Sequence, residues 1–429
     1  MINALMLILN LIIMIIMGVP VAVAMSMTSI IVFIIGGYPF HIFPQFLIAI
    51  ASSWTLLAVP LFIIAGSFMN EFGVTERLFK FASVCVGHIR GGLANVNVLA
   101  SMIFAGISGS SVADVAGLGK VELKAMNDAG YNKKISIGVT LASSVVGPII
   151  PPSISFILYG VIANVSIAKL FLAGIIPGIT ICINLMFVNY IIALKHPEYF
   201  PKKQKASFKD FPPAFKAAIF VLMAPLLILL GMTSGYISPT EAGAGACFYS
   251  MFVGIVYRTI SLDKIWRSVK ISMLQAANAM LLVSVASVMG YILTYERIPQ
   301  IFTKIIFVNI AGGNVWIVLL LVDLVFLLIG CFMSGTAALI ILTPILLPTI
   351  IQAGIDPIHF GVIICYGLVI GVATPPVGIG LYIISDIADV KLEETIISVL
   401  PYLVPLIISL FIITYIPQLS LWLPNLVMK

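Results

Sequence analysis

The sequence contains very little charge. Of its 429 residues only 9% are Asp, Glu, Lys or Arg, whereas 61% are hydrophobic and the mean hydropathy is +1.20. Soluble globular domains carry about 25% charged residues, so this chain has too few to cover a water-exposed surface. Apolar stretches of about 20 residues, long enough to cross a bilayer as α-helices, recur along nearly the whole chain. The composition predicts an all-α polytopic membrane protein and excludes a peripheral enzyme, a nucleic-acid-binding protein and a disordered scaffold.

Histidine and cysteine are also scarce. The five cysteines lie singly in apolar runs without a CxxC pair, which argues against a disulfide framework or a cysteine metal site. The N-terminal segment MINALMLILNLIIMIIMG has no charged leading region and no clear cleavage site. We therefore expect a retained first membrane helix rather than a signal peptide.

The basic residues concentrate in a few short segments. The net charge is +6, and the most hydrophilic stretch, KHPEYFPKKQKASFKDFPPAFK, begins at Lys195 near the middle of the chain. Cytoplasmic loops of membrane proteins are enriched in Lys and Arg. Residues 195–215 are therefore predicted to form a cytoplasmic linker between two halves, residues 1–194 and 216–429.

The two halves match each other at a nearly constant offset of 224 residues. The matching pairs are Gly66 with Gly290, Gly147 with Gly371, Pro151 and Pro152 with Pro375 and Pro376, and Pro177 with Pro401. At an offset of 226, Ser108, Gly109 and Ser110 match Ser334, Gly335 and Thr336. Several anchors in the same order at one spacing predict an internal repeat.

Each repeat is expected to contain a re-entrant hairpin. In the first half an apolar stretch has His88 and Arg90 before it and Lys120 and Lys124 after it, so both of its ends belong in the cytoplasm. The tract SGSS, residues 108–111, interrupts this stretch, and each arm is then too short to cross the bilayer at about 1.5 Å per residue. We predict a hairpin over about 93–118.

The second hairpin is predicted over about 315–352. No Lys or Arg occurs between Lys304 and Lys391, so this hairpin lacks basic flanks and should open to the opposite side of the membrane. Equivalent elements that face opposite sides define an inverted repeat, which is typical of secondary transporters. An odd number of crossings per half then places both termini outside the cytoplasm.

A Pro-Pro pair follows each hairpin tip and predicts broken helices at about 135–163 and 360–386. Proline removes an N–H group and leaves the carbonyl one turn earlier without its helical hydrogen bond. Irregular backbone occurs inside a bilayer only where other protein groups or a water-filled site supply hydrogen-bond partners. Neutral carbonyl and hydroxyl oxygens, without a His, Cys or carboxylate cluster, favour Na⁺ over a divalent ion. The alternative is that these residues only pack and kink membrane helices. The predicted sodium ligands are Ser108, Gly109, Ser144, Gly147 and Pro151 at one site and Gly335, Thr336, Gly371, Thr374 and Pro376 at the other.

The hairpin tips should also attract an anion, because exposed N–H groups and the positive dipole end lie at each helix N-terminus. The predicted cargo is a carboxylate-bearing solute, contacted by the hydroxyls of Ser110, Ser111, Ser153 and Ser155. Each of these serines alone is equally compatible with helix packing. Asp114 lies one turn beyond Ser110, where a charge must be paired or solvated. Its carboxylate is expected to contact the substrate, to change the affinity of an ion site, or to stabilise the hairpin tip by hydrogen bonds.

Four further charged or titratable residues carry expectations. Glu241 is expected to cap a helix that begins near Pro239, and Asp323 and Asp386 are expected to be buried charges. His359 is expected in a loop after Asp356 and Pro357.

One enzymatic alternative comes from the GxSG pattern at residues 106–109, which fits the nucleophile of an intramembrane serine protease. That chemistry needs a histidine base beside the serine, and no histidine is expected inside an apolar helix. We therefore predict that the chain is not an enzyme.

Four motifs resemble the large membrane subunit of tripartite ATP-independent periplasmic (TRAP) transporters. They are GISGSSVAD at residues 106–114, ASSVVGPIIPPSI at 142–154, SPTEAGA at 238–244 and VATPPVGIGLY at 372–382. They occur in the family's order, and the resemblance covers essentially the whole chain. It implies an elevator mechanism in which a transport domain with both hairpins and both broken helices slides against a scaffold, coupled to two or more Na⁺ ions and without an organic cofactor.

The resemblance also implies partners and a location. The partners are a separate small four-helix membrane subunit and a periplasmic solute-binding protein, and the location is the bacterial inner membrane. The implied substrate is sialic acid (N-acetylneuraminate), or else a C4-dicarboxylate. The alternative is a stand-alone Na⁺- or H⁺-coupled organic-anion symporter that needs no binding protein.

Overall fold

The computed structural model describes residues 2–201 and 210–428, and over these residues it contains helices and no β-strand. The first half contains α1 (Ile2–Ile16), α2 (Val21–Ile35), α3 (Ile42–Ala51), η1 (Thr55–Leu57), α4 (Ala58–Glu71), α5 (Val74–Val86), α6 (Leu93–Ser108), α7 (Ser111–Asp128), α8 (Lys133–Ser144), α9 (Ile154–Ala163), α10 (Ile167–Lys195) and η2 (Pro197–Tyr199). The second half contains α11 (Phe211–Thr233), α12 (Pro239–Val256), α13 (Leu262–Tyr295), α14 (Ile298–Thr303), the π-helix η4 (Lys304–Ile310), α15 (Val315–Phe332), α16 (Gly335–Gln352), α17 (Pro357–Ile370), η5 (Gly371–Ala373), α18 (Ile379–Ala388), α19 (Leu392–Tyr415) and α20 (Gln418–Val427).

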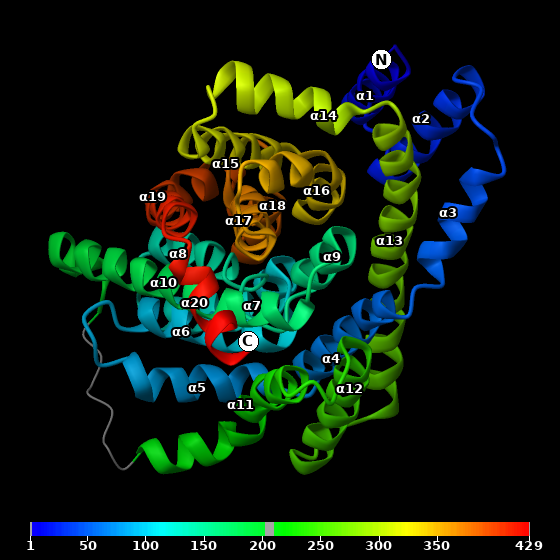
Figure 1. The fold of residues 1–429 in the computed structure, drawn as a ribbon. Coiled ribbons are helices and arrows are strands. Elements are labelled where there is room, and N and C mark those ends of the chain that lie inside the picture. Colours follow the sequence, from blue (N-terminus) through cyan, green and yellow to red (C-terminus); the bar gives the residue numbers. More distant parts are fainter. Residues whose placement is uncertain (1, 202–209, 429) are drawn as a thin grey trace.

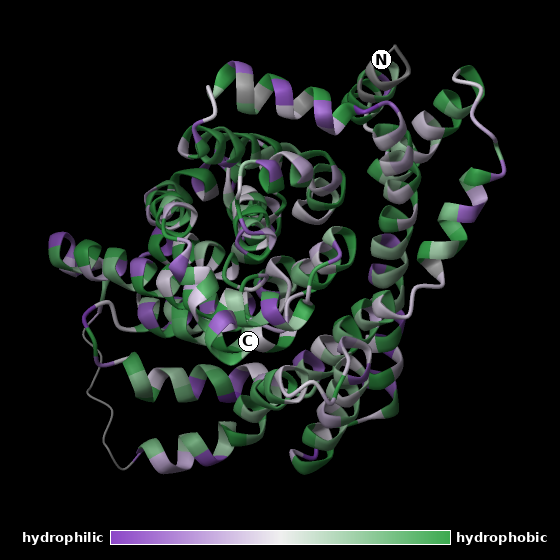
Figure 2. Cartoon of the chain, in the orientation of Figure 1, coloured by the Kyte–Doolittle hydropathy of each residue, from purple (hydrophilic) through white to green (hydrophobic). Residues whose placement is uncertain are grey.

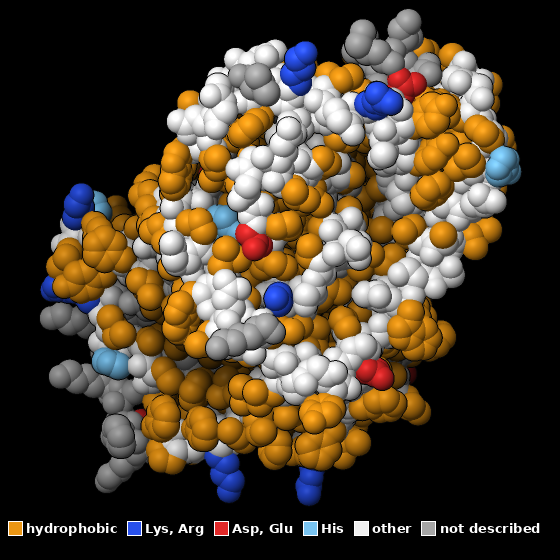
Figure 3. All heavy atoms as spheres, in the orientation of Figure 1, with side chains coloured by type: hydrophobic (Ala, Val, Ile, Leu, Met, Phe, Trp, Pro, Cys, Tyr) orange, Lys and Arg blue, Asp and Glu red, His pale blue; other side chains and the backbone are white. Residues whose placement is uncertain are grey.

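The prediction of an all-α membrane protein is confirmed over the described residues. Six of the described helices, α10, α11, α13, α15, α16 and α19, are long and apolar enough to cross a membrane, and a seventh span is possible if α3 and α4 together form one bent span. Apolar residues cover most of the helices (Figure 2). On the face drawn in Figure 3, the charged side chains are few and stand apart among hydrophobic and neutral atoms.

The helices form two groups (Figure 1). We call residues 93–195 and 315–427, which form α6–α10 and α15–α20, the core block. We call residues 21–86 and 211–295, which form α2–α5 and α11–α13, the frame. The longest helix, α13, runs along one side of the molecule and packs against α2, α3 and α4, while α5 joins the frame to α6 of the core block.

The same helix order occurs twice within the core block. α6 to α10 in the first half are followed in the second half by α15 to α19, and Pro177 and Pro401 lie inside α10 and α19. The contacts are also paired. α7 packs on α18 and α16 packs on α9, while α8 packs on α19 and α17 packs on α10. Each set of five helices is therefore completed by helices of the other set.

The second helical hairpin, α15 with α16, spans 315–352, the range predicted from the sequence. The first hairpin is longer than predicted, because α7 runs to Asp128 and not to residue 118. The helical period continues past that point: Leu118, Glu122 and Met126 are buried, whereas Lys120 and Lys124 are exposed. The lysines that suggested a loop lie on the outer face of a continuing helix.

Both Pro-Pro pairs interrupt a helix. The first break separates α8 from α9, and the second separates α17 and η5 from α18. The observed broken helices span 133–163 and 357–388, close to the predicted ranges. Of the predicted linker, 195–215, residues 202–209 lie outside the described residues. Its described part includes the last residue of α10, η2 and the first five residues of α11, so helices extend into the predicted range from both sides.

Candidate functional site

The tip of the first hairpin is a tight turn between α6 and α7. Gly109 has a φ of 58°, in the left-handed region, and its N–H donates to the carbonyl of Ala105 at 3.1 Å, which is a glycine C-cap. Ser110 then caps α7, because its hydroxyl accepts a hydrogen bond from the Ala113 N–H at 3.4 Å. These two residues reverse the chain and leave the first turn of α7 at the tip.

This tip packs directly against the first Pro-Pro break. A Cβ at Gly109 would lie 2.7 Å from the carbonyl oxygen of Pro152, and a Cβ at Gly147 would lie 3.3 Å from the N atom of Ser111. Neither position has room for a side chain. The hydroxyls of Ser111 and Ser144 form a hydrogen bond of 3.1 Å. The predicted first set of ligands, residues 108, 109, 144, 147 and 151, is thus brought to one place.

The Ser108 hydroxyl stands out within this set. Ser108 is 6% exposed, and its Oγ has no hydrogen-bond partner among the described residues. Buried hydroxyls are nearly always hydrogen-bonded, so an unpaired one needs an explanation such as an ion or water. Its neutral oxygen can ligate a small cation.

The second hairpin tip meets the second break in a similar way. Ser334 caps α16 by accepting from the Ala337 N–H at 3.3 Å. Gly330 of α15 and Gly371 approach so closely that a Cβ on either would overlap backbone atoms, and a Cβ at Gly335 would lie 3.5 Å from the Leu368 carbonyl. The glycines let backbone contact backbone at this junction.

Three carbonyl oxygens converge beside Gly378, just after the second Pro-Pro pair. A Cβ placed on Gly378 would lie 2.8 Å from the carbonyl oxygens of Thr374 and Val372 and 2.9 Å from that of Gly371. Two of the oxygens in this cradle already accept a backbone N–H, that of Thr374 from Gly378 and that of Gly371 from Thr374, both at 3.2 Å. Each carbonyl oxygen has a second lone pair, and neutral oxygens are the ligands of hard cations. Of the other residues predicted for this site, Thr336 is half-buried on the first turn of α16 and Pro376 is exposed.

The family can now be assigned. The sequence profile of the family described as "Tripartite ATP-independent periplasmic transporter, DctM component" matches residues 8–419. The chain belongs to this family. The resemblance noted from the four motifs is confirmed: the chain is the large permease subunit of a TRAP transporter and not an enzyme.

Individual relatives agree with the family. The chain is 42% identical over 375 residues to the sialic acid TRAP transporter large permease protein SiaM of Vibrio cholerae, and the match covers 87% of each chain. It is 40% identical over 373 residues to the C4-dicarboxylate TRAP transporter large permease protein DctM of Pseudomonas aeruginosa, covering 87% of this chain and 86% of the relative. The solved YdaH transporter of Alcanivorax borkumensis shares the fold, with a TM-score of 0.65 at 16% identity over 88% of each chain.

The residues predicted to contact the substrate differ in whether their polar side-chain atoms already have hydrogen-bond partners. The Ser153 hydroxyl donates to the Pro148 carbonyl and accepts from the Phe156 N–H, so it is fully engaged in capping α9. Ser110 caps α7, Ser111 bonds to Ser144, and Ser155 is half-buried. Asp114 is 1% exposed and neither of its carboxylate oxygens has a hydrogen-bond partner among the described residues.

A buried polar network lies below the first tip and was missed by sequence reasoning. Asn97 Nδ2 donates to Thr140 Oγ1 at 2.7 Å, and Ser143 Oγ donates to Asn97 Oδ1 at 2.7 Å. Ser101 Oγ lies 3.1 Å from Ser143 Oγ and 3.5 Å from Oε1 of Glu122, a carboxylate that is 1% exposed. The network joins α6, α7 and α8. Helical periodicity is the signal that could have found it, because Asp114, Leu118 and Glu122 share one helix face.

The remaining charge predictions are partly right. Glu241 and Ser238 form a full capping box at the start of α12, which confirms the capping prediction. Asp323 is fully buried as expected, but Asp386 is exposed, so that prediction is wrong. His359 was expected in a loop, yet it lies in the first turn of α17 at 2% exposure, because Asp356 caps the helix and starts it at Pro357.

The protease geometry is not assembled in the described residues. His41, His88 and His196 are exposed, and the one buried histidine, His359, lies 3.2 Å from the Thr414 carbonyl. Ser108 Oγ has no base beside it. The GxSG pattern is the C-terminal turn of α6.

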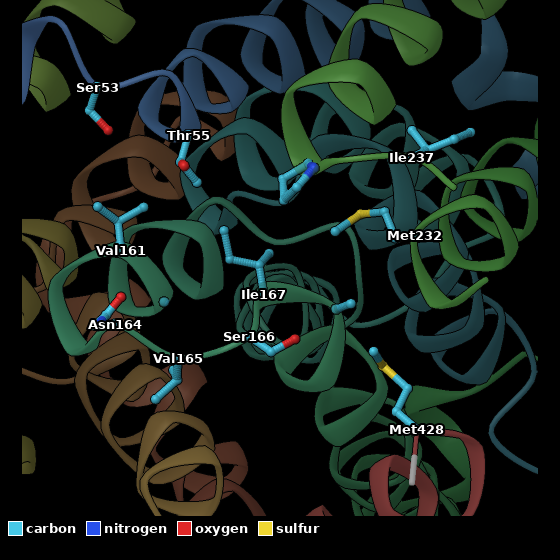
Figure 4. A pocket seen from close by; sticks show the side chains of 13 residues that line it. Ser53, Thr55, Val161, Asn164, Val165, Ser166, Ile167, Met232, Ile237 and Met428 are labelled. Atoms are coloured by element: carbon cyan, nitrogen blue, oxygen red, sulfur yellow. The ribbon is translucent and has the colours of Figure 1, made fainter. Parts of the chain in front are cut away.

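A cavity of about 550 Å³ lies between the core block and the frame (Figure 4). Its walls come from the α9–α10 connection on one side and from η1, the α11–α12 connection and Met428 on the other. Asn164, Ser166 and Thr55 add polar groups. None of the predicted ligand residues lines it, so this cavity is a separate gap between the two groups of helices.

Proposed function

We propose that this permease imports a carboxylate-bearing solute together with Na⁺. The favoured substrate is sialic acid, with a C4-dicarboxylate next. The observation that carries the proposal is the pair of oxygen-rich junctions, one at each Pro-Pro break, where a hairpin tip packs on broken-helix backbone.

The donor sets at both junctions fit Na⁺. At the first, Ser108, whose hydroxyl has no partner, directly precedes Gly109, and Gly109 packs on the Pro152 carbonyl. Ser144, Gly147 and Pro151 belong to the same junction. At the second, the carbonyls of Gly371, Val372 and Thr374 converge, with Gly335 and Thr336 on the adjoining tip. No group of three or more His, Cys, Asp or Glu suited to a metal ion occurs in the described part of the chain. Sodium bound at either junction would neutralise the negative ends of these carbonyl dipoles.

The relatives and the hairpin tips support an anionic substrate. The two named relatives carry sialic acid and C4-dicarboxylates in their names, and both classes are carboxylates. The first turns of α7 and α16 begin at Ser110 and Ser334, and a helix N-terminus favours a carboxylate. Bound Na⁺ near each tip would strengthen the same attraction, which couples the ion to the anion.

The packing supports an elevator with inverted repeats. The core block carries both hairpins and both breaks, and it meets the frame through an apolar contact. Gly106, Ile107 and Pro152 of the core block face Phe62 and Ile228 of the frame across a small gap. Apolar side chains without interlocking hydrogen bonds suit a sliding contact. In this proposal both termini lie on the periplasmic side of the bacterial inner membrane.

Membership of the TRAP family supports two partners. They are a small four-helix membrane subunit that extends the frame and a periplasmic solute-binding protein that delivers the substrate. The alternative, a stand-alone Na⁺- or H⁺-coupled organic-anion symporter, differs in needing neither protein.

Reconstitution tests the proposal. The permease is placed in proteoliposomes with its candidate small subunit, and uptake of labelled N-acetylneuraminate or succinate is measured with and without the candidate binding protein, under an inward Na⁺ or K⁺ gradient. We expect uptake only with Na⁺ and with the binding protein. Equal uptake of free solute without the binding protein would establish the stand-alone symporter, and equal uptake in K⁺ would rule out sodium coupling.

A further inference from the structure

Two buried ionisable side chains take no part in the proposed sodium and substrate sites. Asp323 lies in the middle of α15 and is 0% exposed, and His359 lies in the first turn of α17 and is 2% exposed. Ionisable groups inside a membrane protein are costly and generally functional. Both residues belong to the second half of the core block.

Thr414 of α19 connects the two side chains. Its hydroxyl donates to Asp323 Oδ1 at 3.2 Å, and its backbone carbonyl lies 3.2 Å from His359 Nε2. A carbonyl oxygen can only accept, so Nε2 carries a hydrogen and donates it. In the neutral ring, His359 Nδ1 is then a bare acceptor.

One polar atom on each side chain has no hydrogen-bond partner. Asp323 Oδ2 and His359 Nδ1 are both buried and have no hydrogen-bond partner among the described residues. With both groups deprotonated, the protein would hold a bare carboxylate beside a neutral ring in a low-dielectric interior, which is strongly unfavourable. A single proton on either atom removes that bare charge or balances it with an imidazolium.

No described Lys or Arg side chain forms a hydrogen bond with either atom. Lys304 and Lys391, between which the sequence has no Lys or Arg, are exposed. Lys169 is half-buried in the first turn of α10, a helix that packs on α17. The other titratable groups at this end of the helices have their own partners. Asp356 accepts from the Ile358 and His359 N–H groups, Tyr159 donates to the Pro357 carbonyl, Tyr415 donates to the Trp316 carbonyl, and Tyr366 donates to the Leu406 carbonyl. Cys365 lies further along α17, and α16 and α20 contribute no titratable side chain.

We propose that Asp323 and His359, linked through Thr414, form a proton-binding site in the core block. The bound species is one proton, held on Asp323 Oδ2 or on His359 Nδ1, and the site joins α15 of the second hairpin to α17 and α19. It is separate from the proposed sodium ligands. Loss of the proton loosens the contact between the three helices, so proton binding stabilises the present arrangement of the second hairpin.

Thermal unfolding of the full-length chain in lipid nanodiscs tests the site without relying on sodium or substrate. The unfolding midpoint is followed by tryptophan fluorescence between about pH 5 and 8, the range in which histidine titrates. The wild type should gain stability as the pH falls, with a slope that exceeds that of Asp323→Asn by about one bound proton. His359→Gln leaves the buried Asp323 carboxylate in place, so this variant should still take up the proton and keep a steeper profile than Asp323→Asn. Asp386→Asn, an exposed acid on α18, and His41→Gln, an exposed histidine, serve as controls and should keep the wild-type profile.

The results of this experiment distinguish a proton site from its absence. If Asp323→Asn follows the wild-type pH profile, the proton site is wrong, whatever is found for transport. If Asp323→Asn does not fold, Thr414→Val decides instead, because it removes the hydroxyl that donates to Asp323 and keeps the backbone carbonyl that accepts from His359. Without that donor the carboxylate should take up its proton at a higher pH than in the wild type, and an unchanged profile refutes the site.

Discussion

The hydroxyl of Ser144 accepts a hydrogen bond from the hydroxyl of Ser111, because its own hydrogen is given to the Leu141 carbonyl at 2.7 Å. This bond ties the first residue of α7 to the last residue of α8. The tip of the first hairpin and the first helix break are therefore one rigid feature, and a change at one is expected to affect ion binding at the other.

Ser108→Ala tests the first sodium site. Removing the unpartnered hydroxyl should raise the Na⁺ concentration for half-maximal uptake roughly tenfold, equivalent to about 1.4 kcal/mol, with little change in the amount of protein in the membrane. The measurement is a sodium titration of uptake in proteoliposomes. Thr336→Ala tests the second site by the same titration.

Ser29→Ala is the matched control for Ser108→Ala. Ser29 lies in α2 of the frame, and its hydroxyl is also buried without a hydrogen-bond partner. Its sodium titration should overlay that of the wild type. Superimposable curves for the wild type and Ser108→Ala would contradict the proposed first site.

Gly378→Ala should close the cradle at the second break. The added methyl group would lie 2.8–2.9 Å from three carbonyl oxygens, closer than carbon and oxygen can approach without a shift of backbone. We expect loss of sodium-dependent uptake, measured as above. Gly290→Ala in α13 is the control, because a Cβ there meets nothing within 4 Å; normal sodium dependence in Gly378→Ala would argue against a cation in the cradle.

Asn97→Ala should destabilise the first hairpin. It removes the donor to Thr140 and the acceptor for Ser143, and hydrogen bonds between membrane helices contribute about 0.6 to 2 kcal/mol each. Unfolding followed in detergent should show a loss of about 1–3 kcal/mol. Asn127→Ala, on the exposed side of α7, should be neutral; equal losses in the two variants would mean that the buried network adds nothing.

Ser238→Ala should weaken the start of α12 and leave transport intact. Loss of an N-cap costs about 1 kcal/mol, and here Glu241 Oε2 also accepts from both the N–H and the hydroxyl of Ser238 at 2.7 Å. Ser261→Ala removes a plain N-cap from α13 and should lower the unfolding midpoint less. If Ser261→Ala instead lowered the unfolding midpoint more than Ser238→Ala, the Glu241 half of the capping box would add no stability beyond that of the Ser238 N-cap.

Sequence patterns predicted the broken segments well because their signals are local. Each Pro-Pro pair removes N–H groups from the chain it stands in, and Ser or Gly reverses the chain at each tip regardless of what surrounds it. The bounds predicted for the second hairpin, 315–352, came from such local signals and match α15 and α16. The match of Gly66 with Gly290 between the two halves did not predict how these glycines pack. Gly66 lies against the backbone of Ile107, whereas a Cβ on Gly290 would meet no atom within 4 Å.

Burial of single charges could not be predicted in the same way. Glu122 stands between Lys120 and Lys124, which indicates a solvated segment, yet residues two apart on a helix point to nearly opposite faces. The burial of Glu122 and the exposure of Asp386 depend on which helices pack alongside, and that information is tertiary. His359 was misplaced for the same reason, since Asp356 begins a helix immediately after what looks like a turn.

The crossed contacts of α7 with α18 and of α16 with α9 have a consequence for how this protein can be made. Each broken helix packs partly on its own half and partly on the other, so neither half covers its broken helix alone. A chain cut at the central linker should therefore give two fragments that are insoluble or degraded when produced alone and that regain a stable fold only when produced together. The two halves of the chain would then depend on each other for folding in the way that the subunits of an obligate heterodimer do.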